Sequence, residues 1–460
     1  MRTRDAVKRR LFFLPFLAAA LLQAADLTVL ATADTHADTP RWDRLAPLIV
    51  EERDRAGAEN TLLIDAGDTL QGCFEGTFRN GAIPLAILNF LRFDVWVPGN
   101  HDFAFRPFRF GEFRGAVLGG DWKTGGFTPQ TWRMFTRAGH RIAVIGFGES
   151  GLPKRLLPGS GVTFADPEAA LSQAVREALA AGAELLILVR HDGLYAPTGP
   201  LYKLLRRYPE IALVIGAHTH QEIAGKRVGR AWYVQPGGHA RCLGVIRVRF
   251  PEDGGRPVIA SELRFPPEDG PVMAWPEAIA GPIREARQQA AEPAGRSEKA
   301  LKPPDTRDFS GGLGDLVEQA LRRETGAEVV LMTLYRAPGE GRTEFSRGEF
   351  FRLLPHEGRI CRVDLTPAEL EAAVRDLVRL QRRRKNLAIR FGGLRVYRDK
   401  HGDLRRVVMP QPGPDGRIPV ALTDYELAGC GGGVPELFSG RPWRDTGVRL
   451  RDAAIRFLMR

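Results

Sequence analysis

The sequence has few cysteines and no long hydrophobic run. Its four cysteines are widely separated and form no Cys-x-x-Cys pair, which excludes a dense disulfide framework and a thiolate metal site but leaves one or two disulfides open. The apolar run at residues 11–22 is shorter than the roughly 20 residues of a membrane-spanning helix. No internal repeat is evident. With 460 residues and 43% apolar content, the chain predicts a soluble globular protein large enough for two domains.

Basic residues exceed acidic residues only moderately. The net charge is +11, and residues 1–24 hold five basic residues and one acidic residue, so +7 remains on the rest of the chain. This excess is small for a dedicated nucleic-acid-binding protein, and no nucleic-acid partner is expected. The tightest basic cluster, Arg382-Arg383-Arg384-Lys385, is best explained as the solvated end of a helix. Attraction to an anionic substrate or to a membrane surface is the alternative explanation.

The N-terminus has the pattern of a secretory signal peptide. Basic residues precede the apolar run 11–22, and Gln23-Ala24-Ala25 follows it. We therefore expect a signal peptide over residues 1–24, a mature start near Ala25 or Asp26, and a periplasmic or extracellular location. No membrane span is expected after cleavage. An uncleaved anchor is the alternative.

Short apolar runs of strand type alternate with helical patterns through the first half of the chain. Such alternation favours βαβ units and a mainly parallel sheet. Residues 102–140 interrupt the pattern as an irregular insertion, and residues 233–250 look like closing β structure. The predicted strands are 27–32, 61–64, 95–97, 142–146, 185–189 and 211–215, and the predicted helices are 42–55, 83–91, 167–181 and 201–207.

Polar side chains of the kinds that bind metals follow five of these predicted strands. In open α/β folds, ligands bind beyond the carboxyl ends of the strands, so we expect these side chains to converge. Five of the nine histidines lie in these motifs. The alternative, that the five motifs are polar loops without a joint role, therefore explains the pattern poorly. The motifs are Asp34-Thr35-His36, Gly67-Asp68, Gly99-Asn100-His101-Asp102, His191-Asp192-Gly193 and His218-Thr219-His220.

These side chains suit a particular group of ions. Asp, Asn and His without thiolates favour divalent Mn, Zn, Fe or Co. Two such ions about 3.5–4 Å apart can clamp both ends of an in-line displacement. Two ions held this close need a carboxylate that binds both of them, and Asp68 is the natural candidate.

The ordered set of five motifs resembles the calcineurin-like metallophosphoesterases. Asp34-Thr35-His36 and the Gly-Ala-His-Thr-His stretch at 216–220 are similar to the branch of secreted 5′-nucleotidases and UDP-sugar hydrolases. The resemblance covers residues 27–250 and continues more weakly at Gly392-Gly393-Leu394 and in the glycine turn 428–433. It implies a metallophosphoesterase α/β sandwich at 25–250, a linker at 251–305, and a smaller α/β 5′-nucleotidase-type substrate domain at 306–460.

The resemblance also implies roles for the motif residues. His101 would stabilise the transferring phosphoryl group or assist the leaving oxygen, with Asp102 beside it, while a metal-bound hydroxide attacks phosphorus. Carried over by motif, one metal would be held by Asp34, His36, Asp68 and His220, and the other by Asp68, Asn100, His191 and His218.

Two departures from the family pattern concern catalysis and substrate. The carboxylate that usually follows the catalytic histidine by three residues is replaced by Ala104, which leaves Asp102, Asp65, Asp121 and Asp192 as candidates to orient His101. In the C-terminal region the family's Asn-Gly-Gly-Ile-Arg loop is replaced, and no adenine clamp is visible. The substrate-binding candidates that remain are Arg342 and Tyr425.

We therefore expect an exported dinuclear hydrolase of small phosphate esters, nominally 5′-nucleotides or nucleotide sugars. Two alternatives stay open. The altered substrate loops would also suit another anionic ester, either a non-nucleotide phosphate or a sulfur-centred one. The loss of the carboxylate at position 104 would suit a protein that retains its metals with little turnover. The oligomeric state is not indicated.

Overall fold

The computed structural model describes residues 26–154, 156, 160–195, 199–305, 307, 309–337, 339–355, 358–432, 438 and 441–458. The predicted signal peptide lies outside the described residues. The chain divides into two compact units. The first comprises Met1–Ser150 and Gly161–Ala286, and the second comprises Gly151–Ser160 and Arg287–Arg460.

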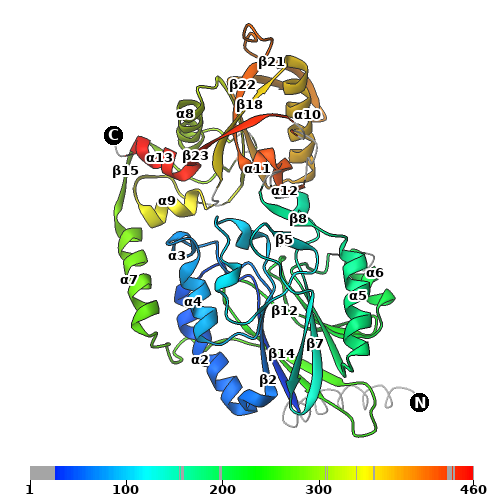
Figure 1. Ribbon diagram of the computed structural model, residues 1–460. Helices are drawn as coiled ribbons and strands as arrows, with labels where there is room; N and C mark the ends of the chain where they lie inside the picture. The colour runs from blue at the N-terminus through cyan, green and yellow to red at the C-terminus, as the bar shows by residue number, and fades with distance from the viewer. Residues whose placement is uncertain are drawn as a thin grey trace, which may run out of the picture. The chain divides into compact units, whose positions relative to one another are not determined.

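The first unit is built on two sheets (Figure 1). In its described part, each sheet has six strands and a parallel centre, with β1, β2, β3 and β4 parallel in one and β7, β9, β10 and β12 parallel in the other. The first sheet runs β14 (Val258–Arg264), β13 (Leu243–Arg249), β1 (Leu27–Thr32), β2 (Thr61–Asp65), β3 (Val95–Trp96), β4 (Ala116–Val117). The second runs β11 (Glu222–Val228), β12 (Ala231–Pro236), β10 (Ile211–Gly216), β9 (Leu185–Arg190), β7 (His140–Phe147), β6 (Trp132–Arg137).

The inner faces of the two sheets share one apolar core. Val29 and Ile64 of the first sheet belong to the same buried cluster as Val144, Ile187 and Ile215 of the second. Burying a branched aliphatic side chain contributes about 1.5–3 kcal/mol, so this layer fixes the two sheets face to face. The predicted α/β sandwich with a mainly parallel core is confirmed.

Helices cover the outer faces of the sheets. The amphipathic helix α2 buries Trp42, Leu45 and Ile49, while α5 and α6 pack their apolar sides on the second sheet. Asp166 is the N-cap of α5, since its carboxylate accepts the Glu168 N–H at 2.9 Å. The elements are α2 (Thr39–Ala56), α3 (Phe74–Thr77), α4 (Ala82–Phe90), α5 (Pro167–Ala180), α6 (Pro200–Arg207), the 3₁₀ turns η1 (Ala58–Asn60), η2 (Asn100–Phe103) and η3 (Phe110–Glu112), and the small pair β5 (Trp122–Thr124) and β8 (Val162–Phe164). The 3₁₀ turn η4 (Leu152–Lys154) belongs to the second unit.

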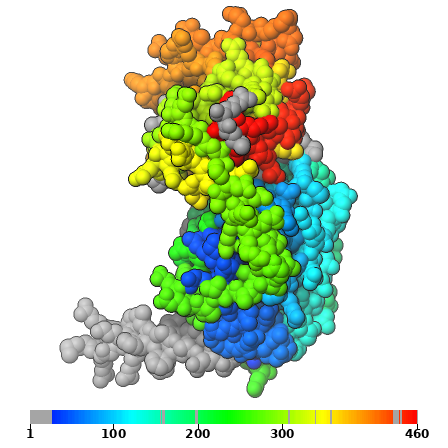
Figure 2. Space-filling model, turned by 90° about the vertical axis from the view of Figure 1, so that its left-hand side faces the viewer, coloured from blue at the N-terminus to red at the C-terminus, as the bar shows by residue number. Residues whose placement is uncertain are grey.

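Two stretches differ from the sequence prediction. Residues 102–140 are not wholly irregular, because β6 forms an antiparallel hairpin with β7. Residues 251–305 contain β14, which pairs with β13 and completes the first sheet, so that the units divide between Ala286 and Arg287. The helix α7 (Glu277–Ala291) spans that division and lies at the surface, burying Ile279, Ile283 and Ala286 on one side (Figure 2).

The second unit centres on a five-stranded, mostly antiparallel sheet in its described part. The predicted glycine turn instead forms the short helix α12 (Gly429–Gly432). The sheet runs β19 (Leu387–Gly392), β16 (Val329–Tyr335), β22 (Ile418–Thr423), β18 (Arg359–Leu365), β23 (Trp443–Arg449). The other elements are β15 (Pro293–Leu301), β17 (Arg342–Ser346), β20 (Arg395–Arg398), β21 (Leu404–Val408), α8 (Gly312–Thr325), α9 (Arg347–Leu353), α10 (Pro367–Arg383), α11 (Asp424–Leu427) and α13 (Leu450–Leu458).

Two expectations from composition can be compared with the structure. All four cysteines are free thiols, so neither of the disulfides left open by the sequence is formed. None of the helices in the described residues combines the length and the apolar character needed to cross a membrane.

Candidate metal centre

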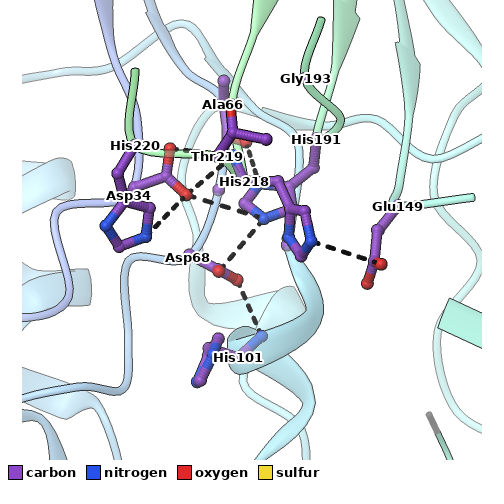
Figure 3. Close-up of polar contacts among 12 residues, drawn as sticks. Asp34, Ala66, Asp68, His101, Glu149, His191, Gly193, His218, Thr219 and His220 are labelled. Atoms are coloured by element: carbon purple, nitrogen blue, oxygen red, sulfur yellow. Dashed lines mark hydrogen bonds and ion pairs between the residues drawn. The ribbon is translucent and has the colours of Figure 1, made fainter. Parts of the chain in front are cut away.

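The five predicted motifs lie where their strands end. Asp34 and His36 follow β1, Asp68 follows β2, and Asn100 begins η2 after β3. His191 follows β9 directly, and the His218 motif follows β10. The structure thus brings the strand ends of both sheets to one place, where the side chains point toward one another (Figure 3).

The backbone is strained at these positions. The left-handed region is rare for residues other than glycine and costs roughly 1–2 kcal/mol each, and strain of this kind clusters at functional sites. Five of the seven predicted ligands occupy it, with φ between 49° and 71°: Asp34, His36, Asp68, His218 and His220.

Two groups of side chains each form a compact triad. In the first triad, the ligand atoms of Asp34, His36 and His220 all lie within 4.8 Å of one another, and the His36 and His220 Nε2 atoms are 3.1 Å apart. The ligand atoms of Asp68, His191 and His218 form the second triad by the same measure. Both triads consist of predicted ligands, in the grouping that the sequence predicts.

Asp68 lies between the triads. Its Oδ2 is 3.1 Å from His191 Nε2 and 4.0 Å from His36 Nε2. Its other oxygen accepts the His101 backbone N–H at 2.8 Å. Gly99 packs so closely against Asp68 and His191 that a Cβ at this position would collide with both. A carboxylate in this place can serve two ions at once.

Backbone carbonyls orient two of the histidines. His36 Nδ1 donates to the Gln71 carbonyl at 2.8 Å, and His191 Nδ1 donates to the Ala66 carbonyl at 2.7 Å. These bonds hold a proton on Nδ1 and leave Nε2 as the ring atom directed at the triads, as is usual for metal-binding histidines. Glu149, which the sequence did not indicate, contacts the other ring nitrogen of a third histidine: its Oε1 lies 3.5 Å from His218 Nε2.

Burial and mutual charge set the protonation states. Burial raises the pKa of Asp34 well above its ordinary value, although His191 opposes it, and lowers the pKa of His36 to about 4. Burial alone would also raise the pKa of Asp68, but His191 and His101 hold it well below its usual range. Asp68 in turn overcomes the effect of burial on His191 and raises its pKa to about 10. The place between Asp34 and Asp68 therefore favours positive charge.

The donor set fits divalent cations. It offers carboxylate and amide oxygens with imidazole nitrogens, which borderline ions such as Mn, Zn, Fe and Co accept. Asn100 Oδ1 is buried and has no hydrogen-bond partner among the described residues, which is costly unless another group binds it. Seven side chains from five strand ends therefore form a candidate two-metal centre.

His101 is held by a residue that the sequence prediction missed. Its Nδ1 forms a short hydrogen bond with the side-chain Oε1 of Gln71, so a neutral amide occupies the place of the expected carboxylate. Ala104 is exposed. The other candidate carboxylates have partners of their own. Asp65 accepts Thr32 Oγ1 at 2.6 Å, Asp121 accepts the Gly148 N–H at 3.1 Å, and Asp192 accepts Ser150 Oγ at 2.9 Å.

Asp102 is a structural carboxylate in this geometry. Its two oxygens accept four backbone N–H groups, those of Asp68, Thr69, Leu70 and Gly99, at 2.8–2.9 Å. Burial, with Asp68 nearby, raises its pKa to about 7. Asp102 therefore joins the loop after β2 to the loop after β3.

A sixth histidine lies beside the first triad. The His239 ring centroid is 5.2 Å from that of His36 and 5.4 Å from that of His220. The backbone N–H of His239 donates to the Asp34 carbonyl at 2.6 Å. It follows β12, the neighbour of β10, so the strand-end pattern could have indicated it. The sequence prediction did not include it.

The two predicted substrate residues lie in the second unit. Arg342, at the start of β17, is exposed and forms an ion pair with Glu349. Tyr425 is half-buried in α11, with its hydroxyl 3.4 Å from that of Tyr335.

Comparison with known proteins agrees with this architecture. Residues 27–222 match the family model of the calcineurin-like phosphoesterases, so this part of the chain is similar to that family. The "Probable 5′-nucleotidase" of Treponema pallidum (strain Nichols) is 24% identical over 252 residues, which cover 47% of this chain and 40% of that protein. The chain thus spans about two fifths of the length of the curated relatives that it matches first.

Solved structures share the fold over most of the chain. The putative 5′-nucleotidase from Staphylococcus aureus superposes with a TM-score of 0.79 at 17% identity, covering 94% of this chain and 96% of that one. The sulfate thiohydrolase SoxB from Thermus thermophilus superposes with a TM-score of 0.64 at 19% identity, covering 95% of each chain. The similarity shows the fold and includes both units.

Proposed function

We propose that this protein is a dinuclear metal-dependent hydrolase of small phosphate esters, with 5′-nucleotides or nucleotide sugars as its substrates. The observation that carries the proposal is the pair of triads with Asp68 between them. The ions are two of Mn, Zn, Fe or Co. One would be held by Asp34, His36, Asp68 and His220, and the other by Asp68, Asn100, His191 and His218.

Bound ions would activate a water molecule and offset the negative charge that develops on the phosphoryl group. The protein's own contribution is positioning and proton control. Gln71 holds the Nδ1 side of His101, which leaves Nε2 to donate a hydrogen bond to a phosphoryl oxygen or to the leaving oxygen. Asp102 keeps the loops that carry Asp68 and His101 in register.

A specific observation favours the alternative of a non-nucleotide substrate. Arg342, the phosphate-binding candidate, is already paired with Glu349, and Tyr425 is half-buried with its hydroxyl 3.4 Å from that of Tyr335, so neither predicted contact is fully available to a nucleotide. The substrate would then be another anionic ester, phosphorus- or sulfur-centred.

A substrate panel tests these possibilities. The metal-free protein would be reconstituted separately with Mn, Zn, Co and ferrous iron, and given AMP, a UDP-sugar, an aryl phosphate and a thiosulfate ester. Preference for AMP or the UDP-sugar supports the nucleotide proposal. Equal turnover of the aryl phosphate, or turnover of the thiosulfate ester alone, supports the alternative. Bound metal without any turnover would overturn both in favour of a binding protein.

We also propose export to the periplasm or the extracellular space. The support is the order of basic, apolar and small residues at the N-terminus. Cell fractionation with N-terminal sequencing tests it. A mature start near Ala25 or Asp26 is expected, and an intact N-terminus in the cytoplasmic fraction would contradict export.

Changing Gln71 should affect turnover rather than metal binding. Gln71→Ala leaves His101 without its Nδ1 partner, and we expect kcat to fall roughly 10- to 100-fold with little change in KM, since a misoriented acid or base loses much of its effect. Gln71→Glu supplies another acceptor oxygen and should recover most of the activity. Metal content, measured by elemental analysis, should be equal in all three proteins. Equal activity of Gln71→Ala and the unchanged protein would contradict the assignment.

Removing the Asp102 carboxylate should destabilise the first unit. Asp102→Ala strips an acceptor from four buried N–H groups, and we expect a loss of about 3–5 kcal/mol in the free energy of unfolding. Urea unfolding of the metal-free protein measures it. Asp166→Ala is the control, because it removes a single exposed N-cap bond that contributes about 1 kcal/mol. Equal losses for the two variants would contradict the structural role of Asp102.

A further inference from the structure

The positive charge of the chain is concentrated in one part of the second unit. Residues 379–406 contain eleven Lys and Arg and two Asp, a net charge of +9, while the whole chain carries +11. Residues 1–24 account for another +4, which leaves −2 for all the other residues together. The excess positive charge is therefore confined to one region, and such a region favours binding to an anionic partner.

Most of this charge lies on a two-stranded hairpin and the end of the helix beside it. In β20 and β21, Val396 and Val407 pair with each other and pack on the core of the unit. Because side chains alternate along a strand, the pairs on either side face outward: Arg395 opposite Val408, and Tyr397 opposite Arg406. All four of these side chains are exposed.

The end of α10 is attached to the hairpin. Arg382 forms an ion pair with Asp403, and Arg398 donates to Gln381 Oε1 at 2.7 Å. The outward residues are not neutralised in this way. Among the described residues, Arg395, Lys400, Arg405 and Arg406 have no ion-pair partner, and all four are exposed. We call Arg395, Tyr397, Lys400, Arg405, Arg406 and Val408 the basic hairpin surface.

We propose that the basic hairpin surface docks on an anionic phospholipid bilayer. Tyr397 and Val408 are 47% and 37% exposed and lie among the arginines, so the surface combines positive charge with apolar contact area. Arginine and tyrosine suit a bilayer interface because each has an apolar body and a polar end. Among the residues that the structure describes, no ion pair cancels the charge of Arg395, Arg405 and Arg406, so the attraction of a headgroup layer acts on several arginines at once.

A single-stranded nucleic acid fits this surface less well. Proteins that bind it use several aromatic side chains along a charged groove, whereas Tyr397 is the one aromatic residue among the six that define this surface. The inference does not depend on the metal centre and goes beyond the proposed hydrolase activity.

Vesicle co-sedimentation of the full chain tests the proposal. The probes are phosphatidylcholine vesicles with and without phosphatidylglycerol. The variant is Arg395→Gln/Arg405→Gln/Arg406→Gln, and the control replaces three exposed arginines of the first unit, Arg114→Gln/Arg176→Gln/Arg230→Gln. The N-terminal basic residues are the same in every protein, so a difference in vesicle binding between variant and control is due to the hairpin substitutions.

Binding is expected for the phosphatidylglycerol vesicles alone. The partition coefficient of the hairpin variant should be lower on the order of 100-fold, since each arginine near an anionic surface raises the partition coefficient about fivefold. The control should change far less, and binding should weaken as the salt concentration rises from about 0.1 M to about 1 M. Equal losses in variant and control would overturn the proposal. So would no vesicle binding, or tight binding to a single-stranded oligonucleotide in its place.

Discussion

Replacing Asp68 with asparagine should lower kcat/KM for phosphate esters by roughly 1,000-fold and reduce the bound metal to one ion or fewer. The carboxylate lies 3.1 Å from His191 Nε2 and 4.0 Å from His36 Nε2, one histidine from each triad. Asparagine keeps the shape and the bond to the His101 N–H but removes the charge that two cations share. Charge stabilisation by metals contributes several kcal/mol, and each 1.36 kcal/mol is about tenfold in rate.

Metal content and activity have to be measured together. Elemental analysis after dialysis against each ion gives the stoichiometry, and steady-state kinetics gives kcat/KM. Asp38→Asn is the matched control, because Asp38 lies two residues after His36, outside both triads, with Arg41 as its partner. The control should keep two ions and its activity. An Asp68→Asn protein that binds two ions and turns over normally would contradict the shared role of Asp68.

The positions of the metal ligands could be predicted because they follow from strand order. A strand such as 27–32 can be predicted from its own apolar residues alone, and β1 spans Leu27–Thr32 as predicted. Once parallel strands are known, their carboxyl ends must share one edge of a sheet, which groups Asp34 with Asp68 in the first sheet and His191 with His218 in the second. The two groups meet because the sheets pack face to face. The left-handed backbone at Asp34 and His218 was not predicted, since no glycine marks it.

The residues around the ligands could not be predicted in the same way. Gln71 is 30 positions from His101 in sequence, and Glu149 is 69 positions from His218; only the folded loops bring each pair together. A polar residue in a loop has no periodicity to reveal its partner. The hairpin strand β6 was missed for a related reason, because its burial pattern is intermediate rather than alternating.

Replacing His101 with alanine should lower kcat by 10²- to 10⁴-fold while both metal ions stay bound. A positioned acid or base contributes about that much, and the His101 side chain is in neither triad. Its backbone N–H, which donates to Asp68 at 2.8 Å, survives the change. His239→Ala is the matched control. It removes an imidazole beside His36 and His220 that the proposed reaction does not use, so its kcat should change little.

The choice of substrate then separates two roles for His101. If His101 protonates the leaving oxygen, the loss should be large for an alkyl phosphate and small for an aryl phosphate, because a good leaving group needs no proton. If His101 stabilises the phosphoryl oxygens, both substrates should lose kcat equally, since the same charge develops in each reaction. Full activity of His101→Ala toward both substrates would show that Asn100 and the triads act without it. Loss of bound metal would show instead that His101 helps to hold an ion.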